Sequence, residues 1–314
     1  MFLRFKFKSI PWLSCALVVA SILGGGCGES SSPPAPTVSL ADKLARALKI
    51  SDPKARADNL LRLVNELLAA ADQPAADRAL TAIKEIIPKV DDPVEQARLW
   101  ADLAERQARA SQKGAARESL LLAKSGQEKL AANPFGRVRV LTRMAYAHAA
   151  LGAQNTVADT LATAEGLAKG LTDPEELTRA WLELARARHF LDQHGPRDEA
   201  YTAARTAAMS APEARLKCEL LLDIADAQLK VKQIEPAQQL LGEARRLAGE
   251  IVEPLSRGYV LLKLAEKYSL AGLADDSVQL FAQVEGLIKQ IPERDLQKEL
   301  SDKLAETKKK YGGK

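Results

Sequence analysis

The chain has 314 residues, of which 27% are charged and 4% aromatic, and Ala, Leu, Glu, Lys, Arg and Gln dominate it. This composition favours helices and argues against a sheet protein. The formal charge of +4 falls close to zero once the first 27 residues are set aside, because 42 basic and 41 acidic side chains then remain, so no bulk attraction to nucleic acid is expected.

The first 27 residues have the pattern of an export signal. Three basic residues near the start, Arg4, Lys6 and Lys8, precede an apolar run from Trp12 to Leu23. This run is shorter than the ~20 apolar residues that a membrane-spanning helix needs. A basic start followed by a short apolar stretch predicts a signal peptide over residues 1–27.

The end of this segment resembles a bacterial lipoprotein signal, in which a cysteine is lipidated and becomes the new N-terminus. Cys27 follows three glycines, although the family usually has Leu three residues before the cysteine and here Gly24 stands there. The resemblance implies lipidation at Cys27 and a membrane-anchored lipoprotein that faces the periplasm. Cleavage and release into the periplasm is the alternative. Gly28 gives no signal for retention in the inner membrane, so the outer membrane is the default.

Residues 28–38 form a Ser- and Pro-rich stretch, which predicts a flexible linker. Residues 39–50, with Leu40, Leu44 and Leu48 four apart, predict a helix that covers the first of the units described next. Residues 292–314 predict a charged capping helix with a basic tail.

Between these ends, apolar residues recur every forty or forty-one positions. One column holds large residues, and the residue four positions later is small in five of six units. The large column is Leu60, Trp100, Leu141, Trp181, Leu221 and Leu261, and the later column is Val64, Ala104, Ala145, Ala185, Ala225 and Ala265. A second pair of columns starts at Leu80 and Ile83. Each unit is therefore predicted to be two antiparallel helices that bury their faces against neighbouring units.

The start of each first helix is also visible in the sequence. An acidic or amide residue followed by proline opens five of the six units, at Asp52, Asp92, Asn133, Asp173 and Glu253. Such residues cap free amide groups, and proline suits the first helical position. The fifth unit has Glu213 followed by alanine, so a less sharply defined start is expected there.

These columns resemble the tetratricopeptide repeat over residues 51–291, most clearly in the last unit with Leu261, Ala265, Gly272 and Phe281. The period of forty exceeds the family's usual thirty-four, and Arg197 stands where a small residue normally opens the second helix. The resemblance implies an all-α, αα-hairpin solenoid, a right-handed superhelix of six repeats. It also implies a scaffold that binds a protein segment in its concave groove, for assembly or tethering in the cell envelope.

No residue pattern indicates an enzyme, a metal site, a cofactor or a small-molecule substrate. His189 and His194 are five apart, which places them off a common helical face, and no phosphate-binding loop appears. Cys218 shares a column with small residues and is expected to be buried. Trp100 and Trp181 share a column with leucines, so a core position is expected for both.

One set of polar columns suggests a binding surface. In tetratricopeptide arrays, comparable first-helix positions face the groove, which would place Arg98, Arg139 and Arg179 in a ladder with Tyr146 and Arg186 beside it. An arginine guanidinium can donate two parallel hydrogen bonds to one carboxylate. The candidate partner is therefore a protein or peptide, and an acidic segment is one option. The alternative is that these arginines form a solvated helix face. The protein would then be a self-associating spacer without a groove ligand.

Overall fold

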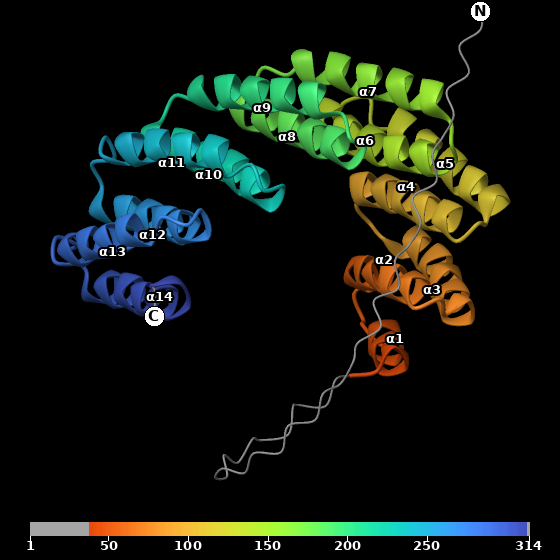
Figure 1. Ribbon diagram of the computed structural model, residues 1–314, viewed down its shortest axis with the longest axis horizontal. Helices are drawn as coiled ribbons and strands as arrows, with labels where there is room; N and C mark the ends of the chain where they lie inside the picture. The colour runs from red at the N-terminus through yellow and green to blue at the C-terminus, as the bar shows by residue number, and fades with distance from the viewer. Residues whose placement is uncertain (1–37, 313–314) are drawn as a thin grey trace, which may run out of the picture. The chain divides into compact units, whose positions relative to one another are not determined.

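The structure is a computed structural model that describes residues 38–312 (Figure 1). The predicted signal peptide with Cys27, and the linker up to residue 37, lie outside the described residues. The described part of the chain contains fourteen α-helices, one short 3₁₀ helix and no strand. None of the helices between residues 38 and 312 is long and apolar enough to cross a bilayer.

The helices alternate between two sets. The first helices of the repeats are α2 (Pro53–Ala69), α4 (Pro93–Arg109), α6 (Pro134–Ala150), α8 (Pro174–Phe190), α10 (Ala214–Lys230) and α12 (Pro254–Leu270). The second helices are α3 (Gln73–Ile86), α5 (Lys113–Glu128), α7 (Gln154–Lys169), α9 (His194–Met209), α11 (Ile234–Ala248) and α13 (Ala274–Ile288). The helix α1 (Leu40–Leu48) precedes them, η1 (Ile87–Lys89) follows α3, and α14 (Arg294–Tyr311) ends the array.

The helix starts follow the capping pattern in the sequence. At five first helices the residue before proline accepts a hydrogen bond from a backbone amide of the first turn, as Asp52 does from the Ala55 amide at 2.6 Å. Glu213, which precedes α10, makes no such bond. The helix α10 nevertheless begins at Ala214, forty residues after Pro174 of α8, so the missing cap leaves the register of the fifth repeat unchanged.

The apolar columns form the core. Trp100 and Trp181 are each 9% exposed, and Cys218 is fully buried with its thiol 3.3 Å from the Ala244 carbonyl oxygen. Burial raises the pKa of the Cys218 thiol to about 12. The expectation of core positions for all three residues is confirmed.

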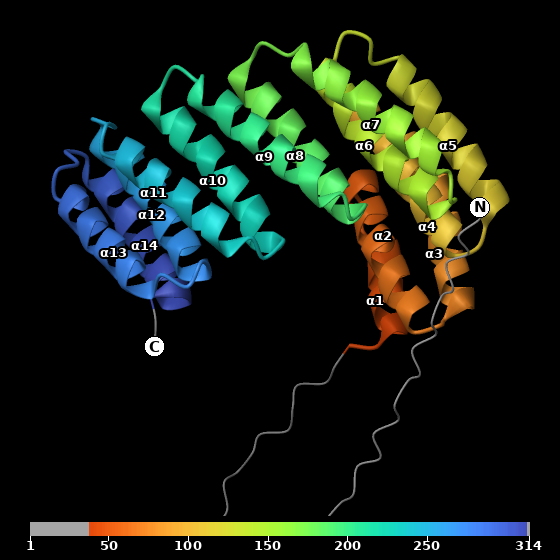
Figure 2. The same cartoon turned by 45° about the horizontal axis from the view of Figure 1, so that its top comes forward.

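Residues 39–312 form one compact unit in which the helix pairs follow one another in an arc (Figures 1 and 2). Each first helix packs on its own second helix and on the next first helix, whereas no two second helices of the described residues pack on each other. The first helices are therefore the inner layer of the arc and the second helices the outer layer. This arrangement confirms the predicted αα-hairpin solenoid.

The turn between the two helices of each repeat contains a residue with positive φ, which only glycine adopts without strain. Glycine occupies this position in two repeats, with φ of 79° at both Gly152 and Gly272. In the other four repeats the position is held by Ala71, Ser111, Asp192 and Lys232, with φ between 57° and 64°. The same turn is thus built with and without glycine.

Candidate binding surface on the first helices

Charged side chains link the first helices at the N-terminal end of the array. Arg98 on α4 lies at the centre of this network. Its guanidinium donates to Asp58 on α2 at 2.8 Å, and to Glu95 and Asp102 on its own helix at 2.9 and 2.5 Å. The Arg98 side chain is only 13% exposed. The N–H groups of the Arg98 guanidinium are therefore used in hydrogen bonds to these three carboxylates and are not available to a binding partner.

Glu95 extends the same network in both directions. Its carboxylate accepts from Arg139 on α6 at 2.6 Å and lies 3.6 Å from the Lys54 ammonium on α2. Burial alone would raise the pKa of Glu95, but the neighbouring Arg98 and Arg139 lower it below its ordinary value. Glu95 is therefore ionised and joins three consecutive first helices.

A second chain of ion pairs continues to α8. Arg143 on α6 lies 4.0 Å from Asp102 on α4 and 3.6 Å from Glu183 on α8. Glu183 also pairs with Arg186 on its own helix at 2.9 Å. Every junction from α2 to α8 therefore has at least one ion pair across it.

An aromatic recess opens beside this chain. The rings of Tyr146 on α6 and Phe190 on α8 lie 4.2 Å apart, with the guanidinium of Arg143 5.3 Å from the Tyr146 ring and that of Arg109 5.3 Å from the Phe190 ring. Tyr146 is 9% exposed, and burial raises the pKa of its hydroxyl to about 12, whereas Phe190 is 46% exposed. A recess of about 520 Å³ lies here, lined by Tyr146, Phe190, His189, Arg106, Arg143, Arg186, Asp102 and Asp192. An exposed aromatic ring among arginines can receive an apolar or carboxylate-bearing side chain.

The junction between α8 and α10 differs from the others. These two helices approach each other over fewer residues than any other consecutive first helices, and no ion pair or hydrogen bond joins them in the described residues. Arg179 on α8 pairs with Glu175 of its own helix at 2.6 Å and is 52% exposed. Asp223 on α10 is exposed and has no ion-pair partner within residues 38–312. We call this junction the open junction.

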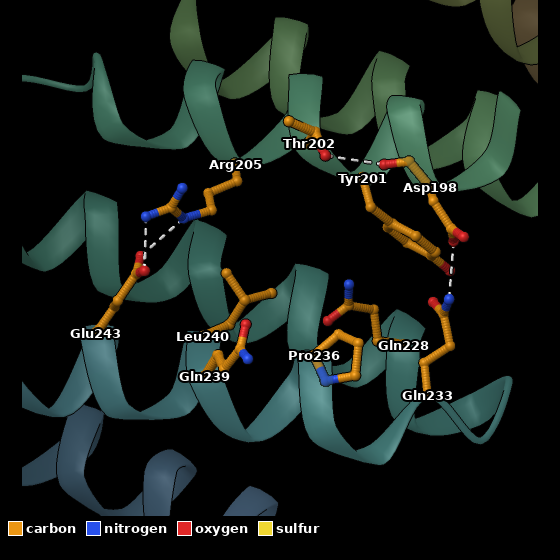
Figure 3. Close-up of a pocket in the computed structure, with 10 residues that line it drawn as sticks. All are labelled: Asp198, Tyr201, Thr202, Arg205, Gln228, Gln233, Pro236, Gln239, Leu240 and Glu243. Carbon is orange, nitrogen blue, oxygen red and sulfur yellow. Dashed lines mark hydrogen bonds and ion pairs between the residues drawn. The ribbon is translucent and has the colours of Figure 1, made fainter. Parts of the chain in front are cut away.

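On the outer side of the same two repeats, polar side chains bridge α9 and α11 around a hollow of about 490 Å³ (Figure 3). Arg205 on α9 makes two hydrogen bonds to Glu243 on α11, at 2.6 and 2.9 Å. The Gln233 amide, just before α11, donates to Asp198 on α9 at 2.8 Å. The second helices of these two repeats are therefore joined by side-chain hydrogen bonds, whereas their first helices are in contact without a hydrogen bond or ion pair between them.

The predicted groove residues fall into two groups. Arg98 and Arg139 bridge neighbouring repeats, and Tyr146 is covered by Phe190 and Arg143. Arg179 and Arg186 are the accessible members, 52% and 43% exposed, and each pairs with a glutamate of its own helix. The surface remains a prediction, with its accessible cations concentrated on α8.

Sequence reasoning missed Phe190 and Asp223. A signal for Asp223 was present, because the column Arg62, Asp102, Arg143, Glu183, Asp223 and Lys263 alternates in charge except between Glu183 and Asp223. Phe190 is the last residue of α8 and lies outside the repeating columns. Among residues 38–312, no group of three or more His, Cys, Asp or Glu side chains could hold a metal ion.

Comparison with known proteins finds no matching family, and the similar solved structures share little sequence with this chain. No family model matches the chain, and no curated protein matches it at a significant level. Similar solved structures include a putative kinesin light chain from Podosopora anserina with nearly identical TPR-like repeats, at 20% identity, TM-score 0.38, covering 63% of this chain and 96% of that one. Ton1535 from Thermococcus onnurineus has 14% identity, TM-score 0.36, and coverages of 83% and 94%. A Rap protein complexed with competence and sporulation factor has 14% identity, TM-score 0.34, and coverages of 87% and 86%.

Proposed function

We propose that this protein is a binding scaffold that holds a segment of another protein on the inner layer of its first helices. The observation that carries this proposal is the recess of about 520 Å³ in that layer, where Phe190 is exposed among arginines from three helices. Exposed aromatic and arginine side chains in a hollow are the residue types that dominate protein interfaces. Curved repeat arrays bind through such extended inner surfaces.

The bound segment is expected to have acidic character. Arg179 and Arg186 each retain donors beyond the single glutamate that they contact on α8, and a guanidinium offers five donors. A carboxylate arriving from a partner can take a forked pair of these hydrogen bonds. Arg98 and Arg139 support the surface by holding α2, α4 and α6 together.

The proposed site of action is the cell envelope. The basic start, the short apolar run and Cys27 support export and lipid anchoring, which would place the array on the periplasmic side of a membrane. Metabolic labelling with palmitate tests this step, and a Cys27→Ser variant should lose the label and leave the membrane fraction. Labelling that persists in this variant would contradict lipidation at Cys27.

Affinity capture from envelope extract with the full-length protein tests the binding proposal. We expect one or more proteins to be retained and then lost with the variant Arg179→Glu/Arg186→Glu. The matched control is Arg78→Glu/Arg117→Glu, which makes the same charge change on α3 and α5 of the outer layer at two exposed arginines. Circular dichroism should show equal helix content in all versions.

The alternative is a spacer whose array associates with itself. Retention of the same proteins by both double variants, or of none by the native chain, would overturn the binding proposal. A molar mass that rises with concentration, measured by light scattering, would then favour self-association.

A further inference from the structure

The open junction between α8 and α10 forms a cleft whose two walls carry opposite charge. On one side lie Arg139, Arg179 and Arg186, together with Glu175 and Glu183 of α8. On the other side lie Glu219, Asp223 and Asp226 of α10, with Lys263, Glu266 and Lys267 of α12 beyond them. Two adjoining hollows of about 370 and 490 Å³ separate these walls. We call this feature the mixed-charge cleft.

Opposite charges meet at the neighbouring junctions but not here. Arg98 contacts Asp58 at 2.8 Å across α2 and α4, and Lys267 contacts Asp226 at 2.7 Å across α10 and α12. At the open junction, Arg179 and Asp223 face the same hollows without an ion pair between them. The Arg205–Glu243 pair joins α9 and α11 on the outer side of these repeats, whereas α8 and α10 are in contact without an ion pair between them.

Asp223 is the one carboxylate of the cleft that has no ion-pair partner within residues 38–312. Desolvation and the neighbouring Asp226 raise the pKa of its carboxyl, and attraction by Arg179, Lys263 and Arg186 only partly offsets this. Its neighbours on α10 are already occupied, since Asp226 contacts Lys230 and Lys267. An incoming cation would therefore find Asp223 free and gain more from it than from either neighbour.

We propose that the mixed-charge cleft binds an extended segment of a partner protein in which an acidic and a basic side chain are about three residues apart. The acidic side chain would contact Arg179 and Arg186, and the basic one would contact Asp223. This inference rests on the proposed function and specifies the chemistry of the bound segment.

The spacing follows from the width of the junction. Packed helices lie about 8–10 Å apart, and an extended chain advances about 3.3 Å per residue. A segment that crosses from α8 to α10 therefore covers about three residues between the two walls. A segment with acidic residues alone would place a carboxylate against Asp223 and lose affinity by like-charge repulsion.

Fluorescently labelled synthetic peptides test the inference on the full-length protein. Four twelve-residue probes of equal length would be compared by anisotropy: one with Glu and Lys three residues apart, one with Glu only, one with Lys only and one uncharged. We expect the mixed probe to bind about ten-fold more tightly than the Glu-only probe. Asp223→Lys should weaken the mixed probe about ten-fold and strengthen the Glu-only probe.

Two further variants test whether any effect of Asp223→Lys comes from the charge at position 223 and not from a general change of surface charge. Asp159→Lys makes the same charge change at an exposed residue of α7 in the outer layer and should leave binding of every probe unchanged. Asp223→Asn removes the charge with little change of shape and should weaken the two probes that contain Lys, the mixed and the Lys-only probe. Helix content is compared first, so that loss of folding is recognised.

The results separate this inference from the broader function. Equal binding of the mixed and Glu-only probes, or mixed-probe binding that does not respond to Asp223→Lys and Asp223→Asn, would overturn the inference. If the Glu-only probe still depended on Arg179 and Arg186, the scaffold function would stand without it. Absence of binding by any probe also overturns the mixed-charge site, and capture from envelope extract still tests the function separately.

Discussion

The junctions from α2 to α6 and the open junction between α8 and α10 are built on the same apolar columns, but their polar residues differ. In the first region, Arg98 and Glu95 join three helices through short ion pairs and are 13% and 9% exposed. In the second, Arg179 and Asp223 face the same hollows without an ion pair between them. Apolar spacing therefore determines that the helices stack, and polar residues determine which junctions are closed.

The largest expected difference between the two regions is in stability. Arg98→Ala should lower the free energy of unfolding by about 3 kcal/mol, because it leaves Asp58, Glu95 and Asp102 without their shared cation in a mostly buried setting. Urea unfolding followed by circular dichroism measures this change. Arg179→Ala, which removes an exposed side chain on α8, is the matched control and should change the free energy of unfolding by no more than about 0.5 kcal/mol. Equal losses in the two variants would contradict the comparison.

The pH dependence should also differ between the regions. Arg98 and Arg139 lower the pKa of Glu95 in the folded chain below its ordinary value of 4.5, so ionised Glu95 stabilises the fold. This stabilisation is fully present above 4.5 and is lost as the pH falls through the lowered value. Glu95→Gln should therefore cost about 2 kcal/mol at pH 7. Its difference from the native chain should shrink as the pH falls below 4.5 and vanish once the pH lies below the lowered pKa of Glu95.

Urea midpoints measured between pH 3 and pH 8 test this expectation. Glu175→Gln, at an exposed ion pair on α8, serves as control and should show a small difference from the native chain at every pH. A Glu95→Gln difference that stays constant across this range would show that the carboxyl acts by packing and not by charge.

The open junction can be closed by one substitution. Arg143 on α6 reaches Glu183 on α8 at 3.6 Å, and position 223 lies forty residues beyond Glu183 in the same column. Asp223→Arg should therefore add an ion pair to Glu183 and stabilise the chain by about 0.5–1 kcal/mol. Hydrogen exchange of α8 and α10 should slow in this variant and remain unchanged in Asp159→Arg. Faster exchange in α8 and α10 would contradict the proposed geometry.

The smallest expected effect concerns the start of α10. Glu213 makes no capping bond, whereas Asp173 at the equivalent place accepts from the Glu176 amide at 2.8 Å. Glu213→Asp should restore such a cap and stabilise the chain by about 0.5 kcal/mol, visible as a small rise in the thermal midpoint. Asp173→Ala should lower stability by about 1 kcal/mol. An unchanged midpoint in Glu213→Asp would show that the fifth repeat begins in a backbone geometry that no side chain can cap.

The fold could be predicted from the sequence because its determinants repeat. A column such as Leu60 to Leu261 marks a buried helical face without knowledge of what covers it, and caps such as Asp52 and Asp92 mark where the helices start. Each of these signals depends only on residues close together in the sequence, and each recurs about every forty residues in the six repeats.

The binding surface could be predicted only in part. Arg98, Arg139 and Arg179 look equivalent in sequence, yet Asp58 and Glu95 occupy the first two and leave the third accessible. Some of these contacts were readable, since Asp58 and Arg98 are forty residues apart in one column. The missing ion pair between α8 and α10 has a signal in one column, where Glu183 and Asp223 carry like charges, but the hollows beside these residues become visible only in the structure.

The turns within the repeats have a consequence for how the array loses its structure. Ala71, Ser111, Asp192 and Lys232 hold left-handed backbone at an intrinsic cost of about 1–2 kcal/mol each. A repeat that carries this penalty is unstable alone and folds only through coupling to its neighbours. Where coupling is strong, several repeats unfold as one cooperative block. Because coupling is weakest between α8 and α10, we expect the chain to divide there into two blocks that melt separately.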